Sequence, residues 1–491
     1  MSTMDKIQEL KASRSAVESG AKAARGRIAS LLDPQSFVEI GAYVKSRSTD
    51  YNMQAQDTPA DGVVTGYGTI EDRLVYVYSQ DASVLGGAVG EMHAAKIAAL
   101  YQKAVEMGAP VIGMIDSQGL RLQELTDALA GYGRIYASQA KASGVVPQIA
   151  VITGTAAGGA AVIPGLSDFT FMIEKQSKVF VSSANAMEKG TTFDEIAAAS
   201  VHGAKTGLAD FVCADEAECF VKIRQLVDML PANNGEDAPI YEDLDDLNRV
   251  SEVLNEVVPE DGSGFDIRPV LSDLSDASVF LEVKAEYAKN MVTGFMRLNG
   301  GTVGVVANNS AQDGGALTVD ACRKAARFVR FCDAFELPIL TVTDTVGFAA
   351  SKAEENAGLA QAAADLAAAF AGATVAKVNL ITGKAYGSAS MIMNSKETGA
   401  DTVLAWPSAS IAVMNAQSAA RILYAQELAE GADLSEKAEE VEKLSTPYAA
   451  AARGSVDDII EPAQTRKHLL VAFGMLAGKQ SLCPPKKRST L

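Results

Sequence analysis

The sequence predicts an α/β protein that consists of two copies of one domain in tandem. At 491 residues the chain is longer than one hydrophobic core usually supports, which favours two domains of about 200 to 250 residues. Pro110 and Asp116 in GAPVIGMIDSQG return as Pro338 and Asp344 in ELPILTVTDTVG, and both are displaced by the same number of positions. Short apolar strands alternate with amphipathic helices in both copies, a pattern typical of mainly parallel sheets covered by helices.

Glycine-rich turns repeat with nearly the same offset. A Gly-Gly pair at 86–87 returns at 314–315, displaced by as many positions as the Pro and Asp landmarks. Downstream, Gly154 in AVITGTAAGG returns as Gly383 in NLITGKAYGS, one position further displaced. Three landmarks in the same order indicate a duplication. Two related glycine turns predict two related binding pockets, and therefore a reaction that joins two bound partners.

The elements of the first copy follow from its periodicity. Residues 1–55 are expected to form a helical lead-in with a turn at LLDPQSFVEI. Alternating β-branched and aromatic residues predict two strands joined by a turn at Glu71-Asp72. The pattern predicts, in order, strands at 61–70 and 73–80, a helix at 90–108, a strand at 109–116, a helix at 125–143 and a strand at 148–154.

An acidic stretch with several Pro and Gly residues, 231–270, separates the copies and is expected to be a surface connector. The second copy runs from 294 to 423. A charged helix is expected at 425–444, and the chain closes with the segment 457–476. We therefore expect an N-terminal domain at residues 1–245 and a C-terminal domain at residues 246–491.

The composition argues against several classes of function. The net charge of −18 argues against nucleic acid as a partner, because that binding depends on many Lys and Arg contacts with phosphate. No run reaches the roughly 18 to 20 apolar residues of a membrane span, and no signal peptide is present, so we expect a cytoplasmic protein. The five cysteines form no CxxC pair, which favours free, mostly buried thiols over a metal site: Cys213, Cys219, Cys322, Cys332 and Cys483.

The first glycine turn lies in VITGTAAGGAAVIPG and carries the candidate chemistry. A buried strand is expected to end near Gly154, and a helix to begin near Gly159. Amides at a helix start lack internal acceptors, so two adjacent ones can hold a developing oxyanion such as a thioester enolate. Close packing of a helix against a strand also requires glycine, and that alternative stays open. The matching turn at 386–389 adds weight to the ligand-binding interpretation.

Side chains suited to catalysis are scarce. The chain has three histidines, and His93 falls on the helix after the first Gly-Gly pair, where a packed or capping role is favoured over a general base. No GxSxG elbow, HExxH motif or Walker loop is present. Asp116 and Asp344 stand at matching strand ends, either as ligand-facing residues or as turn caps. The pattern indicates chemistry carried by a substrate or cofactor, with backbone amides as the main stabilisers.

From LLDPQSFVEI to its C-terminus, the chain resembles the carboxyltransferase subunits of biotin-dependent acyl-CoA carboxylases and decarboxylases, of the propionyl-CoA carboxylase β and methylmalonyl-CoA decarboxylase α type. The segments that carry the resemblance include VVTGYGTI, GVVPQIAVITGTAAGGAAVIPGLSDFTFM, KAARFVRFCDAFELPILTVTD and ITGKAYGSASMIMNSKETGADTVLAWPSASIAVM. It implies two tandem crotonase-like (ClpP/crotonase) domains in a homo-oligomer, usually a hexamer. Acyl-CoA on the N-terminal domain of one subunit would face biotin on the C-terminal domain of its partner.

The resemblance also implies roles for the glycine turns. Gly158 and Gly159 would supply the amides that hold the thioester oxygen, with Gly119 also at the acyl-CoA. Ser388 and Ala389 would face the ureido oxygen of biotin, and the other biotin-binding positions would be Gly347, Phe348 and Gly387. Carboxybiotin would release CO2 and leave a basic ureido nitrogen for the α-proton, which accounts for the missing side-chain base.

Partner chains follow from the same resemblance. The sequence has no biotin-attachment motif of the AMKM type and no Walker or ATP-grasp signature, so biotin is expected on a separate biotin carboxyl carrier protein. The remaining partner would be a biotin carboxylase or a membrane decarboxylase subunit. In the second case this chain would lie at the periphery of a membrane complex that pumps sodium.

The chain departs from the family pattern at both pockets. Gln118 and Leu120 replace small residues of SGGARIQEG, and the segment 345–350 lacks both prolines of VPGFxPG. Met391 stands where propionyl-type enzymes carry an acid associated with acyl selection. The acyl-CoA and the direction of the reaction therefore stay open. The alternatives are a crotonase-type hydratase or hydrolase, and a non-catalytic paralogue that keeps the fold.

Overall fold

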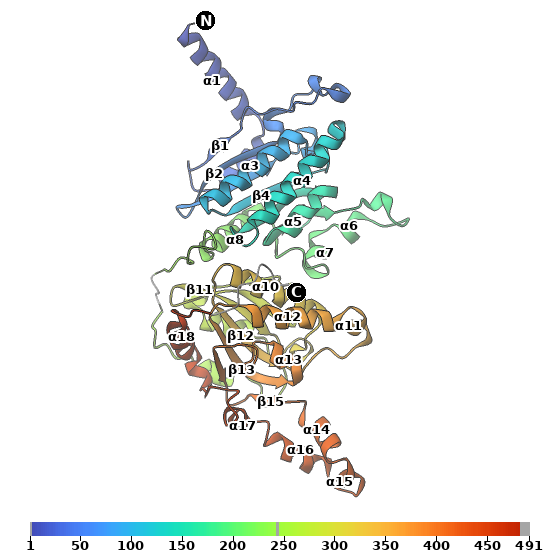
Figure 1. Cartoon of the computed structure of the whole chain (residues 1–491), viewed down its shortest axis with the longest axis vertical. Helices are drawn as coiled ribbons and strands as arrows, with labels where there is room; N and C mark the ends of the chain where they lie inside the picture. Colours follow the sequence, from blue (N-terminus) through green and yellow to red (C-terminus); the bar gives the residue numbers. More distant parts are fainter. Residues whose placement is uncertain (1, 242–244, 482–491) are drawn as a thin grey trace. The chain divides into compact units, whose positions relative to one another are not determined.

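The computed structural model describes residues 2–241 and 245–481. The chain forms two compact units, Met1–Asp237 and Ala238–Leu491, and each contains one eight-stranded sheet with helices packed on it (Figure 1). The predicted duplication of an α/β domain is confirmed.

The sheet of the first unit has the strand order β1-β2-β3-β4-β5-β6-β8, with β7 paired to β5. A tight turn at Glu71-Asp72 joins β2 and β3 into the predicted antiparallel hairpin, and the strands from β3 to β8 pair in parallel. The strands are β1 Val38–Ile40, β2 Val63–Ile70, β3 Arg73–Gln80, β4 Val111–Ser117, β5 Gln148–Ala157, β6 Phe169–Ile173, β7 Lys178–Phe180 and β8 Phe211–Cys213. The helices are α1 Thr3–Ser19, α2 Lys22–Leu31, α3 Glu91–Met107, α4 Leu125–Ala142, α5 Val162–Leu166, α6 Phe193–Ile196, α7 Ala199–Ala204 and α8 Glu216–Met229.

The second sheet has the order β16-β14-β13-β12-β11-β10-β9, with β15 paired to β13. Its strands are β9 Phe280–Val283, β10 Met291–Leu298, β11 Gly301–Asn308, β12 Ile339–Thr345, β13 Lys377–Tyr386, β14 Thr402–Ala405, β15 Ser410–Ala412 and β16 Asp458–Ile459. Its helices are α9 Arg268–Leu274, α10 Val319–Ala334, α11 Lys352–Asn356, α12 Leu359–Gly372, α13 Gly387–Ile392, α14 Ala416–Leu423, α15 Ala425–Ala429, α16 Leu434–Glu442, α17 Pro447–Ala451 and α18 Thr465–Leu476.

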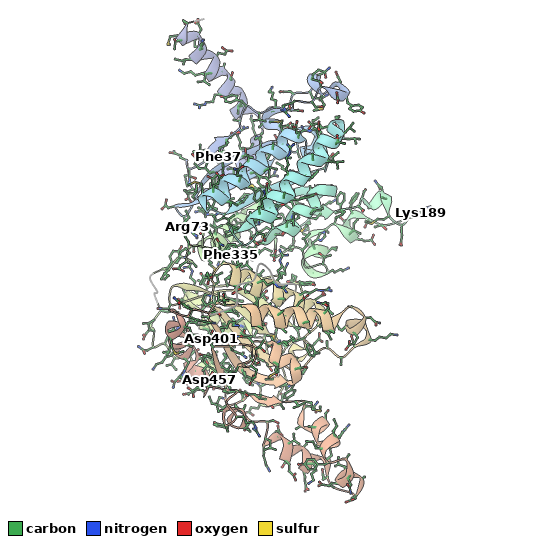
Figure 2. All side chains as sticks on the ribbon, viewed as in Figure 1. Phe37, Arg73, Lys189, Phe335, Asp401 and Asp457 are labelled. Atoms are coloured by element: carbon green, nitrogen blue, oxygen red, sulfur yellow. The ribbon has the colours of Figure 1, made fainter. Side chains whose placement is uncertain are left out.

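Details of the two sheets repeat as the sequence landmarks do. The register between β4 and β5 slips between Ile115 and Ser117, and that between β12 and β13 slips between Thr343 and Thr345. Two carboxylates connect neighbouring strands near their starts in the second sheet, and both are labelled in Figure 2. Asp401, just before β14, accepts a hydrogen bond from the Lys377 amide of β13 at 2.8 Å, and Asp457, just before β16, accepts one from the Val403 amide of β14 at 2.8 Å.

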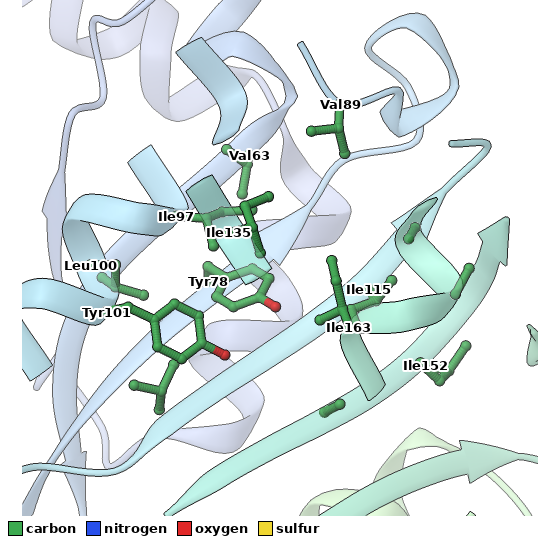
Figure 3. Packing of buried hydrophobic residues seen from close by; sticks show 14 of the residues in the cluster. Val63, Tyr78, Val89, Ile97, Leu100, Tyr101, Ile115, Ile135, Ile152 and Ile163 are labelled. Carbon is green, nitrogen blue, oxygen red and sulfur yellow. The ribbon is translucent and has the colours of Figure 1, made fainter. Parts of the chain in front are cut away.

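One core cluster of the first unit lies between the sheet and helices α3 and α4. Figure 3 shows Tyr78 of β3 beside Ile97 of α3 and Ile135 of α4; Ile152 of β5 belongs to the same cluster, and all four are buried. Complete burial of one such aliphatic side chain contributes about 1.5 to 3 kcal/mol. These contacts hold the strand ends that carry the glycine turns.

The structure differs from the sequence predictions in three places. The lead-in is α-helical only to Leu31, and residues 38–40 instead add a short strand, β1, to the edge of the sheet; the end of the lead-in forms a 3-10 helix, Asp50–Ala55. The strand predicted to end near Gly154 continues to Ala157. The predicted charged helix at 425–444 is two helices, because Gly431 adopts φ +104° and Asp433 caps the second one.

Four of the five cysteines are free and buried, as predicted: Cys213, Cys219, Cys322 and Cys332. Cys483 lies outside the described residues. Among the helices between residues 2 and 481, leaving aside 242–244, none has the length and apolar character that crossing a membrane requires.

Candidate active site

Two glycine turns lie at equivalent strand ends. In the first unit, Gly158 follows β5 with φ +59° and begins a short 3-10 helix, Gly158–Ala161, that leads into α5. In the second unit, Gly387 follows β13 with φ +64° and begins α13. The offset between them equals that between the glycines of the two ITG motifs, so Gly159 corresponds to Ser388. In both units the first amides of a helical turn, which have no acceptor within that turn, lie at the end of a parallel strand.

Gly158 and Gly159 are glycines for different physical reasons. No atom lies within 4 Å of the position that a Cβ on Gly158 would occupy, so only its left-handed backbone requires glycine. A Cβ on Gly159 would lie 3.0 Å from the Tyr136 hydroxyl and 3.1 Å from the Tyr132 ring. Close packing against α4 therefore explains Gly159. It does not explain Gly158, whose surroundings are open.

Gly119 lies beside the first turn, because its Cβ would be 3.1 Å from the carbonyl oxygen of Ala157. Its amide donates to the Ser117 hydroxyl at 3.1 Å, and its carbonyl accepts from the Val89 amide at 2.8 Å. The sequence-predicted acyl-CoA residues Gly119, Gly158 and Gly159 thus gather at one place.

A cavity of about 720 Å³ opens beside the second turn. Gly387, Ser388 and Met391 contribute to its wall, and the remaining wall is mostly apolar and includes Val413, Ile422, Leu423 and Leu444. Ala389 is buried in α13. Gly347 and Phe348 lie on the loop after β12. The carbonyl of Gly347 accepts a hydrogen bond from the Leu317 amide at 2.9 Å, and Phe348 forms a β-bridge with Leu317. Neither is among the described residues that line the cavity.

Asp116 joins β4 to β5, and Asp344 joins β12 to β13. The carboxylate of Asp116 accepts a hydrogen bond from the Thr155 amide at 3.2 Å, and that of Asp344 accepts one from the Lys384 amide at 2.8 Å. A Cβ on Gly154 would lie 2.1 Å from the Asp116 carboxylate. These contacts favour the capping alternative and explain why the third residue of the ITG motif is glycine.

His93 is a packed histidine, as favoured from the sequence. Its Nδ1 donates to the carbonyl of Asp61 at 2.9 Å, and its Nε2 accepts from the Gln80 amide group at 3.0 Å. Complete burial holds the pKa of His93 well below its usual value, so the ring stays neutral.

Comparison with known proteins decides the family. The family model described as the carboxyl transferase domain matches residues 15–491. The chain belongs to the carboxyl transferase domain family. This carboxyltransferase is 43% identical to the propionyl-CoA carboxylase beta chain of Roseobacter denitrificans, over 96% of this chain and 94% of the relative. It is 42% identical to the methylmalonyl-CoA decarboxylase subunit alpha of Veillonella parvula, over 96% and 93%.

A solved structure agrees with these relatives. The crystal structure of transcarboxylase 12S, described as a hexamer assembly with methylmalonyl-coenzyme A and methylmalonic acid bound, superposes with a TM-score of 0.97 at 39% identity. The match covers 100% of this chain and 98% of that one. The family resemblance and the two tandem crotonase-like domains predicted from it are confirmed, and the carboxyltransferase is an enzyme.

Sequence reasoning missed a buried charge cluster behind the first site. Arg121 lies 2.6 Å from the carboxylate of Asp61 and 2.9 Å from that of Glu124, and all three side chains are almost fully buried. Arg121 also donates to the Ala88 carbonyl at 3.0 Å, and Glu124 accepts from the Glu91 amide at the start of α3. The cluster joins the Gly119 loop to the Gly-Gly turn. The only signal in the carboxyltransferase sequence was an Arg and a Glu three residues apart.

In the second unit the equivalent backbone groups, the Ala316 carbonyl and the Val319 amide, bond to two separate side chains, and Asn290 comes from the segment before β10. Asn290 donates to the Ala316 carbonyl at 2.6 Å, and Glu354 accepts from the Val319 amide at 2.7 Å. The two copies therefore hold the same backbone geometry with different side chains.

Gly159→Ala should destabilise the carboxyltransferase by about 1 kcal/mol, the lower end of the cost of overpacking a core. The added methyl group would press on Tyr132 and Tyr136, which must move by a few tenths of an ångström. Chemical denaturation measures the change. Ser388→Ala at the corresponding position is the control and should leave stability nearly unchanged; equal effects of the two substitutions would contradict the packing account.

Proposed function

We propose that this carboxyltransferase moves a carboxyl group between biotin on a separate carrier protein and an acyl-CoA. One observation carries the proposal: Gly158 and Gly387 occupy equivalent strand ends with nearly equal positive φ. A transfer between two bound partners needs two related sites, and the duplication supplies them. Residues 1–245 form the acyl-CoA domain, and residues 246–491 form the biotin domain.

The first turn holds the acyl-CoA. The amides of Gly158 and Gly159 stabilise the negative charge that develops on the thioester oxygen, and Gly119 lies beside them. The bound methylmalonyl-coenzyme A of the transcarboxylase 12S structure supports an acyl-CoA substrate for this chain. No charged side chain is needed at the thioester oxygen, because the fixed dipoles of the two amides stabilise its negative charge.

The second turn holds biotin. The amides of Ser388 and Ala389 face the ureido oxygen, and Gly347, Phe348 and Gly387 complete the site. Gly387 and Ser388 fit such a group, because the cavity of about 720 Å³ beside them is largely apolar and lies within the size range of small-ligand pockets. Gly347 and Phe348 lie on the loop after β12, outside the wall of this cavity. Biotin, when bound, supplies the carboxyl group and a ureido nitrogen that can hold the α-proton.

The chain works within an assembly. The hexamer assembly described for transcarboxylase 12S and the two-site reaction support a homo-oligomer, and a hexamer in particular. The biotin carboxyl carrier protein is a separate chain, and a biotin carboxylase or a membrane decarboxylase subunit completes the system. We place the protein in the cytoplasm, at the membrane surface in the decarboxylase case.

The acyl-CoA has a short acyl chain of the acetyl, propionyl or methylmalonyl type. Met391→Asp should raise the preference for propionyl-CoA over longer acyl-CoAs about tenfold. Met391, in the wall of the cavity beside the second turn, stands where propionyl-type enzymes carry an acid associated with acyl selection, and one methylene in a pocket is worth about 10- to 200-fold. Competition between two acyl-CoAs gives the ratio of kcat/KM. An unchanged ratio would remove Met391 from acyl selection, and Val413→Thr, on an exposed part of the same wall, is the control.

The proposal is tested with purified protein in both directions: labelled carboxybiotin is the donor to acetyl- and propionyl-CoA, and labelled methylmalonyl-CoA is the donor to free biotin. We expect transfer of the labelled carboxyl group with at least one of the three acyl-CoAs. Absence of exchange with all three would overturn the proposal. Release of free CoA without carboxyl exchange would favour the crotonase-type hydrolase alternative.

A further inference from the structure

The first glycine turn rests on a pair of tyrosines from α4. The hydroxyl of Tyr136 donates a hydrogen bond to the carbonyl oxygen of Gly159 at 2.7 Å. Tyr132 packs beside Tyr136 with a ring-centroid distance of 5.8 Å, and it is buried. Tyr136 is half-buried, and burial raises the pKa of its hydroxyl, so that it remains a donor throughout the working range of pH.

The carbonyl of Gly159 has a second donor, the amide of Val162, which closes the helical turn. Together the two hydrogen bonds fix the plane of the peptide that follows Gly159. This matters because two consecutive glycines restrict the backbone less than any other pair of residues. The N–H of Gly159 keeps one direction only if the backbone of Gly159 is fixed, and the two hydrogen bonds to its carbonyl fix that backbone.

The second unit holds its turn differently. Helix α12, which contacts α13, has the sequence LAQAAADLAAAFAG and contains no tyrosine. Its glycine turn continues with Ser388 instead of a second glycine, and Ser390 donates to the carbonyl of Gly387 at 2.8 Å. The tyrosine anchor therefore accompanies the first turn, where the flexible Gly-Gly pair occurs.

We propose that Tyr136 is a positioning residue for the thioester site: its hydroxyl fixes the Gly159 carbonyl and thereby aims the neighbouring amides at the thioester oxygen. This inference rests on the proposed function of the Gly158–Gly159 turn. A hydrogen bond of this kind is worth about 0.5 to 1.5 kcal/mol. Its loss corresponds to roughly a three- to tenfold effect, since each 1.36 kcal/mol is tenfold in rate.

Tyr136→Phe removes the hydroxyl and keeps the ring, so the contact with Tyr132 survives. We expect kcat for carboxyl exchange with propionyl- or methylmalonyl-CoA to fall about three- to tenfold, with KM changed less than about twofold. The direction of the amides affects the transition state most, because the negative charge on the thioester oxygen develops there. Amide hydrogen exchange in the peptide that spans 155–165 should accelerate by a similar factor. Tyr43→Phe, at an exposed tyrosine of the same unit, is the matched control and should change neither quantity.

The two measurements separate the inference from the proposed function. Unchanged hydrogen exchange at 155–165 in Tyr136→Phe would overturn the anchor, whether or not the protein transfers a carboxyl group. Faster hydrogen exchange with unchanged kcat would show that the anchor does not serve the reaction and would also overturn the inference. Absence of carboxyl exchange in the wild-type protein would remove the proposed function, and hydrogen exchange would still decide the anchor.

Discussion

Gly158→Val should reduce carboxyl exchange by at least about 100-fold while the protein remains folded, the size of effect seen when one oxyanion-hole donor is removed. Valine is poorly suited to a residue with φ +59°, and its backbone must rotate away from that value. The rotation would turn the Gly158 and Gly159 amides away from the thioester oxygen. Steady-state kinetics with propionyl- and methylmalonyl-CoA measures the loss.

A control for backbone strain is available in the same chain. Gly262 has φ +69°, and no atom lies within 4 Å of its Cβ position, so Gly262→Val imposes a similar strain in the connector. The strain itself costs about 1 to 2 kcal/mol. Both variants should therefore lose similar stability, and only Gly158→Val should lose activity. Full activity in Gly158→Val would contradict the assignment of its amide.

Arg121→Met should destabilise the first unit by about 3 to 5 kcal/mol, because the substitution leaves the buried carboxylates of Asp61 and Glu124 without their cation. Burial already raises the pKa of Asp61, and Arg121 is the main group that opposes this shift. Denaturant unfolding measures the change. Lys45→Met removes the exposed partner of Asp57 and serves as the control, with little change expected.

The loss of stability caused by Arg121→Met should depend on pH. A carboxyl group whose pKa is higher in the folded state binds its proton more tightly there, so its contribution to stability falls as pH rises. Removing Arg121 raises the pKa of Asp61 further. The destabilisation by Arg121→Met should therefore be larger at pH 8 than at pH 5. An equal loss at both values would mean that the carboxylates are compensated by other groups.

Much of the fold could be predicted because its signals are periodic or repeated. The alternation in 61–80 predicted the β2–β3 hairpin, and the repeated Asp116 and Asp344 marked equivalent strand ends. The break of the helix at Gly431 was missed because the charged residues on either side are good helix formers. The signal was present in Gly431 and Asp433, because glycine is unfavourable within a helix and aspartate is a preferred N-cap.

The sequence located the glycine turns of the candidate site but not the side chains that support them. The sequence cannot distinguish the roles of two adjacent glycines. The structure shows that Gly158 is required by its backbone conformation and Gly159 by close packing. The supporting contacts join positions far apart in the chain, which no local pattern reveals: Arg121 bonds to Asp61, and Tyr136 bonds to Gly159. The roles of the eight site residues toward acyl-CoA and biotin remain predictions.

The most direct test of the two-site account is transfer of a labelled carboxyl group from methylmalonyl-CoA to free biotin by the wild-type protein, Gly158→Val and Gly387→Val. We predict transfer by the wild-type protein and its loss in both variants, because each turn holds one of the two partners. Transfer by either folded variant at the wild-type rate, or no transfer by the wild-type protein, would contradict the account.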